Sequence, residues 1–201
     1  MYAKTKGDNG GVKMSKGLLI ILSGPSGVGK GTVREVLFKN ESLNLHYSIS
    51  MTTRKPREGE VDGRDYFFVS KEKFQQTIEE DGFLEYATFV DNFYGTPKAY
   101  VEQLLNEGKN VMLEIETQGA LQVIQKCPKV LSIFLLPPSL EELEKRIRGR
   151  GTEANNVILK RLAMARDELE TKKYYRYHVI NDTVEKASQD IADIIMKNMK
   201  K

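Results

Sequence analysis

The segment that follows the first apolar run constrains the fold of this chain more than any other feature. Leu18–Leu22 are consecutive apolar residues, and they lead through Ser23 into Gly24-Pro25-Ser26-Gly27-Val28-Gly29-Lys30-Gly31-Thr32. This matches the pattern Gly-x-x-x-x-Gly-Lys between a strand and a helix. Small residues let successive backbone N–H groups curl around a phosphate, while the helix N-terminus and Lys30 add positive charge. The segment therefore predicts a site for a nucleoside triphosphate.

One position departs from the usual form of this loop. The Ser or Thr that normally follows the lysine is Gly31, and Thr32 comes one residue later. The hydroxyl that ligands Mg²⁺ in such loops is therefore missing from its usual place. The sequence leaves the metal ligands open, with Thr32 and Glu114 as candidates, either directly or through water.

The composition fits one globular domain and excludes several other classes of protein. Hydrophobic residues make up 40% of the 201 residues, and 31 basic side chains nearly balance 28 acidic ones. The formal charge of +3 is too small to indicate a nucleic-acid or membrane-surface binder. A single cysteine, Cys127, excludes an internal disulfide, and the apolar runs are far shorter than the roughly 20 residues that span a bilayer. We expect a cytoplasmic protein.

The first residues differ from the rest. Residues 1–16 hold three glycines and four lysines with almost no large apolar side chain, so they cannot bury enough surface to offset the entropy lost on ordering. We expect a disordered leader at 1–16, with Met14 as a candidate start of the natural chain, and one domain at 17–201.

After this leader, short apolar runs alternate with amphipathic stretches of helical length. The predicted strands are Leu18–Ser23, Asn110–Ile115, Lys129–Leu136 and His178–Asn181, and the predicted helices are Gly31–Lys39, Thr117–Lys126, Ser139–Arg148, Ala154–Lys172 and Thr183–Met199. The first three strands are nearly all apolar, as in a parallel sheet covered on both faces. Ser139 followed by Glu142 predicts a capping box. The pattern predicts an α/β fold in which helices cover a parallel sheet.

One segment breaks this alternation and predicts a small inserted lobe. Tyr47–Tyr94 carries short alternating runs around a turn-rich stretch. We expect a mixed α/β lobe at about 47–96, inserted into a core made of 17–46 and 97–201. Within it, Arg54 and Arg57 flank a proline, and Tyr66 and Tyr94 follow. Two guanidinium groups and two phenolic hydroxyls can clamp a second anion of monophosphate size.

Here the sequence resembles the guanylate kinase family of P-loop nucleoside monophosphate kinases. The phosphate loop is followed, in the family's order and spacing, by these motifs: Thr52-Thr53-Arg54-x-x-Arg57-x-Gly59-Glu60, Gly63-x-Asp65-Tyr66, Tyr94-Gly95-Thr96, Gln118-Gly119, Gly149-Arg150-Gly151-Thr152-Glu153 and Val179-Ile180-Asn181-Asp182. The resemblance runs from about Lys16 to the last helix. It implies a P-loop fold, ATP as phosphoryl donor, Mg²⁺, and GMP or dGMP as acceptor.

The resemblance also implies roles for residues of the lobe. Arg54, Arg57, Tyr66 and Tyr94 would hold the GMP phosphate, and Ser50, Glu85 and Thr96 would read the guanine. The chemistry agrees, because guanine presents N1–H and N2–H₂ donors that one carboxylate, such as Glu85, can accept together. Adenine would place an acceptor opposite that carboxylate, which costs about 1–3 kcal/mol per mismatched contact.

The resemblance also implies which residues contact ATP, and it implies a lid at about 146–160. Arg150 and Arg161 would reach the transferring phosphoryl group, with Lys30 and Arg54 as the other catalytic cations, and Arg146 and Asn181 would lie near the adenine. Glu114 and Glu116 end a buried strand, and because they alternate with Ile115 we expect both carboxylates on one face near the phosphate loop, as substrate-binding residues. Gly31, Met51 and Glu116 depart from the family's pattern, which affects the metal shell and one guanine contact.

Three other functions compete with this reading. Domains of this kind that no longer catalyse bind partner peptides, but they are expected to lose Lys30 or the arginines, which are present here. Another phosphotransferase would act on AMP, a deoxynucleotide or a small hydroxyl compound. Glu85 with Ser50 and Thr96 favours guanine, and the tyrosine–arginine clamp favours a monophosphate over a bare alcohol. A regulatory GTPase would carry an Asn-Lys-x-Asp motif, which is absent. The sequence leaves monomer and homo-oligomer open.

Overall fold

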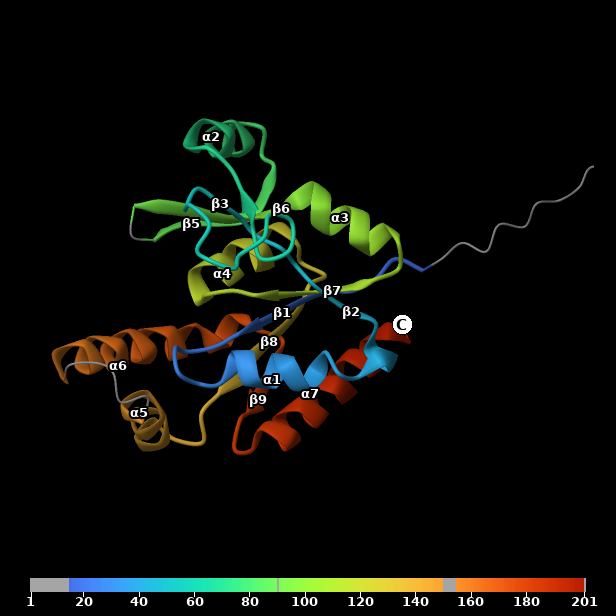
Figure 1. The fold of residues 1–201 in the computed structure, drawn as a ribbon. Helices are drawn as coiled ribbons and strands as arrows, with labels where there is room; N and C mark the ends of the chain where they lie inside the picture. Colours follow the sequence, from blue (N-terminus) through green and yellow to red (C-terminus); the bar gives the residue numbers. More distant parts are fainter. Residues whose placement is uncertain (1–14, 90, 150–154, 201) are drawn as a thin grey trace, which may run out of the picture.

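The computed structural model describes residues 15–89, 91–149 and 155–200, and it contains two sheets (Figure 1). The larger sheet has the order β2-β7-β1-β8-β9, and all its neighbouring strands are parallel. Its strands are β1 (Leu19–Ser23), β2 (Leu45–Tyr47), β7 (Asn110–Glu114), β8 (Leu131–Leu136) and β9 (Tyr177–Ile180). The predicted parallel sheet is confirmed, and β1, which leads into the phosphate loop, lies at its centre.

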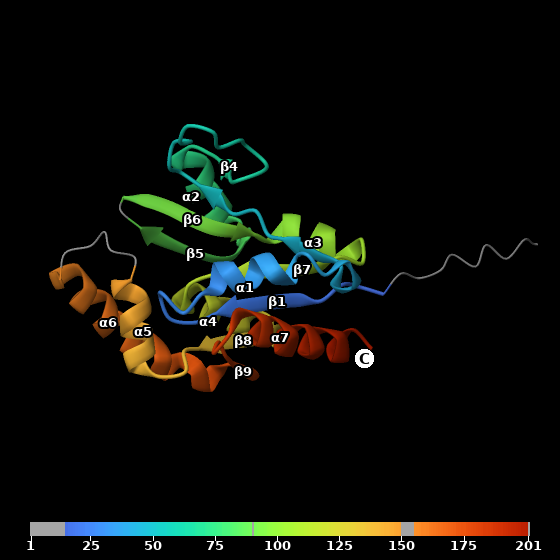
Figure 2. The same ribbon diagram turned by 60° about the horizontal axis from the view of Figure 1, so that its bottom comes forward.

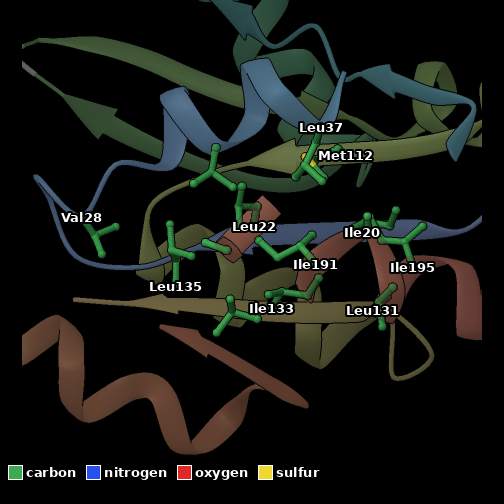
Figure 3. Close-up of a cluster of buried hydrophobic side chains, with 14 of the residues drawn as sticks. Ile20, Leu22, Val28, Leu37, Met112, Leu131, Ile133, Leu135, Ile191 and Ile195 are labelled. Carbon is green, nitrogen blue, oxygen red and sulfur yellow. The ribbon is translucent and has the colours of Figure 1, made fainter. Parts of the chain in front are cut away.

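Helices cover both faces of this sheet because successive strand residues point to opposite sides. Ile20 and Leu22 of β1 pack in the cluster that includes residues of α1 (Lys30–Leu37) and α7 (Val184–Met199). Figure 3 shows this cluster, with Ile191 and Ile195 of α7 beside the strands. Ile21 packs in the opposite cluster, which includes residues of α3 (Lys98–Asn106) and α4 (Thr117–Lys126). Packing against both clusters fixes the position of β1, and therefore the position of the phosphate loop that follows it.

The smaller sheet is mixed and has the order β4-β3-β6-β5. Its strands are β3 (Met51–Thr52), β4 (Phe67–Phe68), β5 (Phe83–Phe89) and β6 (Asn92–Pro97). Helix α2 (Lys71–Glu79) closes it, with Phe74 stacked on Phe83 at 4.5 Å and on Phe93 at 5.4 Å between ring centroids. This sheet and its helix lie to one side of the parallel sheet (Figures 1 and 2). The exact bounds of the lobe, core and lid stay a prediction.

Helices α5 (Leu140–Arg148) and α6 (Asn155–Glu170) lie beyond the carboxyl ends of the parallel strands, on the side toward which the β5–β6 hairpin projects (Figure 2). Ser139 caps α5, since its Oγ accepts from Glu142 N at 3.1 Å. The reciprocal half of the predicted capping box is absent among the described contacts, because the Glu142 carboxylate accepts from Arg146 Nε at 3.2 Å instead.

The remaining elements are two short 3-10 helices, η1 (Glu41–Leu43) and η2 (Thr171–Tyr174). The predicted strands and helices of the core all occur, with ends that shift by one or two residues. Helices α2 and α3 and the edge strand β2 were not predicted from the sequence. Among the described helices, none combines the length and apolar character needed to cross a membrane.

Candidate functional site

The phosphate loop occupies Gly24–Gly29, between β1 and α1, and its shape depends on glycine. Gly27 and Gly29 have φ angles of 86° and 99°, a region that other residues rarely adopt. A Cβ on Gly27 would lie 2.7 Å from Ile147 Cγ1, and one on Gly29 would lie 2.7 Å from Asn181 Nδ2. The backbone is therefore free to curl closely, and its N–H groups precede the N-terminus of α1, where the helix dipole favours an anion.

Lys30 begins α1 and folds back over this loop. Its Nζ donates hydrogen bonds to Gly24 O at 2.6 Å and to Pro25 O at 3.4 Å. These contacts hold the ammonium group beside the curled backbone. The loop thus combines backbone donors with a fixed positive charge, which fits the phosphates of a nucleoside triphosphate.

Helix α6 makes hydrogen bonds to Ser26 of the same loop. Arg161 Nη2 donates to Ser26 Oγ at 2.9 Å, and Ser26 N donates to Glu168 Oε2 at 3.1 Å. Burial raises the pKa of the Glu168 carboxyl, and the nearby Glu116 carboxylate adds to the rise. One cation that the sequence assigns to phosphoryl transfer, Arg161, is thus placed at the loop.

The two residues predicted to lie near adenine both reach Val28 of the loop. Asn181 is 2% exposed and its Nδ2 donates to Val28 O at 2.8 Å, while Arg146 Nη1 approaches the same oxygen at 3.5 Å. The buried Asn181 Oδ1 finds no partner among the described residues. Arg150, the other predicted phosphoryl-contacting arginine, lies outside the described residues.

The predicted phosphate clamp gathers on the smaller sheet. The Arg54 guanidinium lies over the Tyr66 ring at 5.3 Å, and the rings of Tyr66 and Tyr94 are 6.1 Å apart in an edge-on arrangement. Glu60 binds Arg54 in bidentate fashion, with Nη1–Oε2 at 2.9 Å and Nη2–Oε1 at 2.8 Å. Arg57 is exposed on the same loop. Three of the four predicted clamp residues are therefore in mutual contact, and Arg57 lies three residues away from Arg54.

A buried carboxylate lies further along this sheet. Glu85 on β5 is 6% exposed and pairs across the sheet with Thr96 on β6, whose Oγ1 donates to Glu85 Oε1 at 2.5 Å. Burial raises the pKa of Glu85, although the Thr96 hydrogen bonds oppose the rise. Glu85 Oε2 points toward Gly119, since a Cβ there would lie 2.6 Å away. Ser50, the third predicted guanine contact, lies just before β3, and its carbonyl accepts from Phe67 N at 2.9 Å.

The two carboxylates at the end of β7 have different neighbours. Glu114 pairs with Arg34 of α1, with Oε2 and Nη1 2.8 Å apart, whereas Glu116 is the N-cap residue of α4 and interacts with Glu168. The strand ends at Glu114 and Glu116 is the N-cap of α4, so the expectation of one shared carboxylate face stays a prediction.

The described side chains do not form a complete metal cage. No group of three or more His, Cys, Asp or Glu side chains suited to a metal ion occurs within residues 15–89, 91–149 and 155–200. Glu114 is ion-paired and Thr32 is exposed on α1. Such a donor set fits Mg²⁺ only as an ion that keeps waters and substrate phosphates among its ligands.

Comparison with known proteins decides the family. The guanylate kinase family model matches residues 16–198 of this chain. The chain belongs to the guanylate kinase family. This confirms the family, the P-loop α/β fold and the class of enzyme that the sequence predicts.

Individual guanylate kinases resemble the chain over almost its full length. That of Enterococcus faecalis is 59% identical over 180 residues, covering 90% of this chain and 88% of its own. That of Latilactobacillus sakei is 56% identical over 181 residues, covering 90% and 89%. The crystal structure of guanylate kinase from Anaplasma phagocytophilum is 33% identical, with a TM-score of 0.71, and covers 93% of this chain and 88% of that one.

Several site residues of this guanylate kinase family member escaped the sequence analysis. Glu60 and Gly119 stand inside family motifs that imply no role for them, and no motif contains Glu168 or Arg34. Glu168 lies 142 residues from Ser26, so no local pattern connects the two. The sequence does hold a signal for Glu60: a carboxylate six residues after Arg54, across a turn, can form an ion pair with that arginine.

Gly119 offers a direct test of how Glu85 is placed. Gly119→Ala would push a methyl group against Glu85 Oε2, so we expect kcat/KM for GMP to fall about 10- to 100-fold, mainly through KM. Stability should change little, because alanine favours the helix by about 0.5–1 kcal/mol. Steady-state kinetics with GMP and then ATP varied would check this. Gln125→Ala, exposed on the same helix, is the control, and equal KM values for GMP in both variants would contradict the placement.

Proposed function

We propose that this chain transfers the γ-phosphoryl group of ATP to GMP, giving ADP and GDP, and that it also accepts dGMP. The buried Glu85–Thr96 pair beside the arginine clamp carries this proposal. A base-reading carboxylate and a phosphate clamp on one small sheet suit a nucleoside monophosphate, and the phosphate loop suits a triphosphate. The site therefore suits one phosphoryl donor, a triphosphate, and one phosphoryl acceptor, a monophosphate.

The guanine would be read by hydrogen bonds that adenine cannot reproduce. As a carboxylate, Glu85 accepts from guanine N1–H and N2–H₂, while Thr96 holds the carboxylate in place through its 2.5 Å bond. Ser50 would supply a further polar contact. Glu85 is buried. A base with no donors at this position would leave the carboxylate without the hydrogen bonds that offset its desolvation, so binding of that base would be weaker. This asymmetry favours GMP over AMP.

The acceptor phosphate would bind between Arg54, Arg57, Tyr66 and Tyr94. Guanidinium groups bind phosphate oxygens through two parallel hydrogen bonds, which fix orientation as well as charge. An oxygen of the GMP phosphate attacks the γ-phosphorus of ATP, a new P–O bond forms, and the bond to the bridging oxygen breaks as ADP leaves. In-line placement dominates such a transfer, so we assign no general base.

On the donor side, Lys30, Arg150 and Arg161 would neutralise the γ-phosphoryl group. Asn181 and Arg146 would lie near the adenine, and both contact Val28 O of the phosphate loop. Mg²⁺ would arrive with ATP and neutralise charge on its phosphates, with Glu114 or Thr32 reaching it directly or through water. Closure of the lid, residues 146–160, would exclude water and limit hydrolysis of ATP.

A substrate panel tests this proposal. ADP release from ATP and Mg²⁺ would be measured in a coupled assay with GMP, dGMP, AMP, UMP and CMP in parallel. We expect stimulation by GMP and dGMP, with kcat/KM for AMP lower by at least about a hundredfold. Equal stimulation by AMP would contradict the guanine assignment. No stimulation by any nucleotide, with folded protein, would favour the binding-module alternative.

A further inference from the structure

The acid that holds Arg54 has no role in the proposed reaction so far. Glu60 takes both terminal nitrogens of the guanidinium, at 2.9 and 2.8 Å, and its Oε2 also accepts from Arg57 N at 2.7 Å. Both side chains of the pair are shielded, with 15% of Arg54 and 20% of Glu60 exposed. One carboxylate thus ties the side chain of the first clamp arginine to the backbone of the second.

The geometry of a guanidinium shows what this pairing leaves available. Its five N–H groups form a planar fork. The Nη1 hydrogens go to Glu60 and to Lys55 O at 2.8 Å, and one Nη2 hydrogen goes to Glu60. No described carboxylate or carbonyl bonds to the remaining edge, formed by Nε and the second Nη2 hydrogen, and the other side-chain partner of Arg54 is the neutral Tyr94 hydroxyl. That edge has the spacing for a bidentate contact with two phosphate oxygens.

Two aromatic rings lie close to the same guanidinium group. The Arg54 guanidinium lies over the rings of Tyr66 and Phe68, at 5.3 and 5.9 Å from their centroids. The Glu60 hydrogen bonds, and after them the Tyr94 hydroxyl, raise the pKa of Arg54. Arg54 is therefore held along one edge by Glu60 and interacts with both tyrosines assigned to the phosphate.

We propose that Glu60 is a positioning residue for the acceptor: it locks the outer edge of Arg54 so that the inner edge meets the phosphate of the monophosphate substrate. This rests on the proposed function, because it names how that clamp is held. Glu60 acts before substrate binds, since the side-chain entropy of Arg54 is already lost in the free protein. The residue recognises no part of the nucleotide itself.

Glu60→Gln tests the proposal with little change in shape. A glutamine oxygen can still accept from Arg57 N, but the amide cannot accept from both Arg54 nitrogens. We expect KM for GMP to rise about tenfold, with kcat within about threefold and KM for ATP within about twofold. Glu58→Gln is the matched control, since Glu58 is exposed on the same loop and makes no hydrogen bond or ion pair among the described residues.

The same substitution in Arg54→Ala protein distinguishes a role in positioning Arg54 from a role in stabilising the loop that carries Glu60. In Arg54→Ala protein, adding Glu60→Gln should raise KM for GMP by less than about twofold, because the group that Glu60 orients is gone. A full tenfold loss in that background would mean that Glu60 supports the loop independently of Arg54, and a lower KM in the single variant would mean that Glu60 competes with the phosphate. Either result would overturn the proposal.

The wild-type protein in the same assay separates the two levels of inference. GMP-dependent activity in wild type with an unchanged Glu60→Gln variant would overturn only the positioning role. No GMP-dependent activity in wild type would overturn the proposed function and this role with it.

Discussion

Lys30→Ala is expected to lower kcat about a thousandfold, which would be the largest loss from any single change in the phosphate loop. The reason is its position: the ammonium is held 2.6 Å from Gly24 O, beside the backbone donors that would surround the transferring phosphates. Charge developing on those phosphates would lose its fixed counter-charge, while the loop itself would keep its shape through its glycines. Single-turnover measurements at saturating ATP and GMP would report the effect on chemistry.

Lys39→Ala serves as the matched control for this change. Lys39 is exposed just after the same helix, so its loss removes the same charge from the protein without touching the loop. The control should keep kcat within about twofold. If Lys30→Ala also did so, the phosphate loop would not serve the transferring group.

Glu85→Gln is expected to lower kcat/KM for GMP about a hundredfold and to leave KM for ATP within about twofold. The glutamine amide can accept from only one guanine donor and presents its own N–H₂ to the other. Folding should not suffer, since the change removes a buried acid whose pKa is raised mainly by desolvation. Glu102→Gln, exposed on α3, is the control. Unchanged selectivity for GMP over AMP in Glu85→Gln would contradict the guanine role.

The ionisation of Glu85 should also determine how kcat/KM for GMP depends on pH. Guanine binding needs the carboxylate, and burial raises the pKa of Glu85, so kcat/KM for GMP should fall as the pH drops through a value above that of an ordinary glutamate. The loss therefore lies on the acid side. In Glu85→Gln that acid limb should shrink, whereas an unaltered limb would assign it to another group, such as Glu168.

The part of the site that the sequence predicts best is the part set by local chemistry. The phosphate loop is readable because an apolar strand, small residues and a lysine stand in succession, and its glycines are needed for the φ angles observed at Gly27 and Gly29. The central strands are readable because burial on both faces makes them continuously apolar. Helix α3 was missed because Pro97 stands at its N-cap and no side chain caps it, and β2 is a three-residue edge strand.

Contacts between distant segments account for what the sequence could not show. The bond from Ser26 N to Glu168 and the fit of Gly119 against Glu85 depend on how α6 and α4 pack on the sheets. The expectation that Glu114 and Glu116 share a face stays a prediction, because the strand ends at Glu114 and strand alternation no longer places Glu116. The family resemblance supplied residue roles, but only packing reveals which side chains hold the functional ones in place.

The central claim is that one molecule binds a triphosphate at the loop and a guanine monophosphate at the small sheet, and moves a phosphoryl group between them. The most direct test is to incubate the protein with Mg²⁺, GMP and ATP labelled at the γ-phosphate, and to separate the nucleotides. The account predicts that the label appears in GDP in amounts equal to the ADP formed. Label appearing as inorganic phosphate, with no labelled GDP, would contradict it.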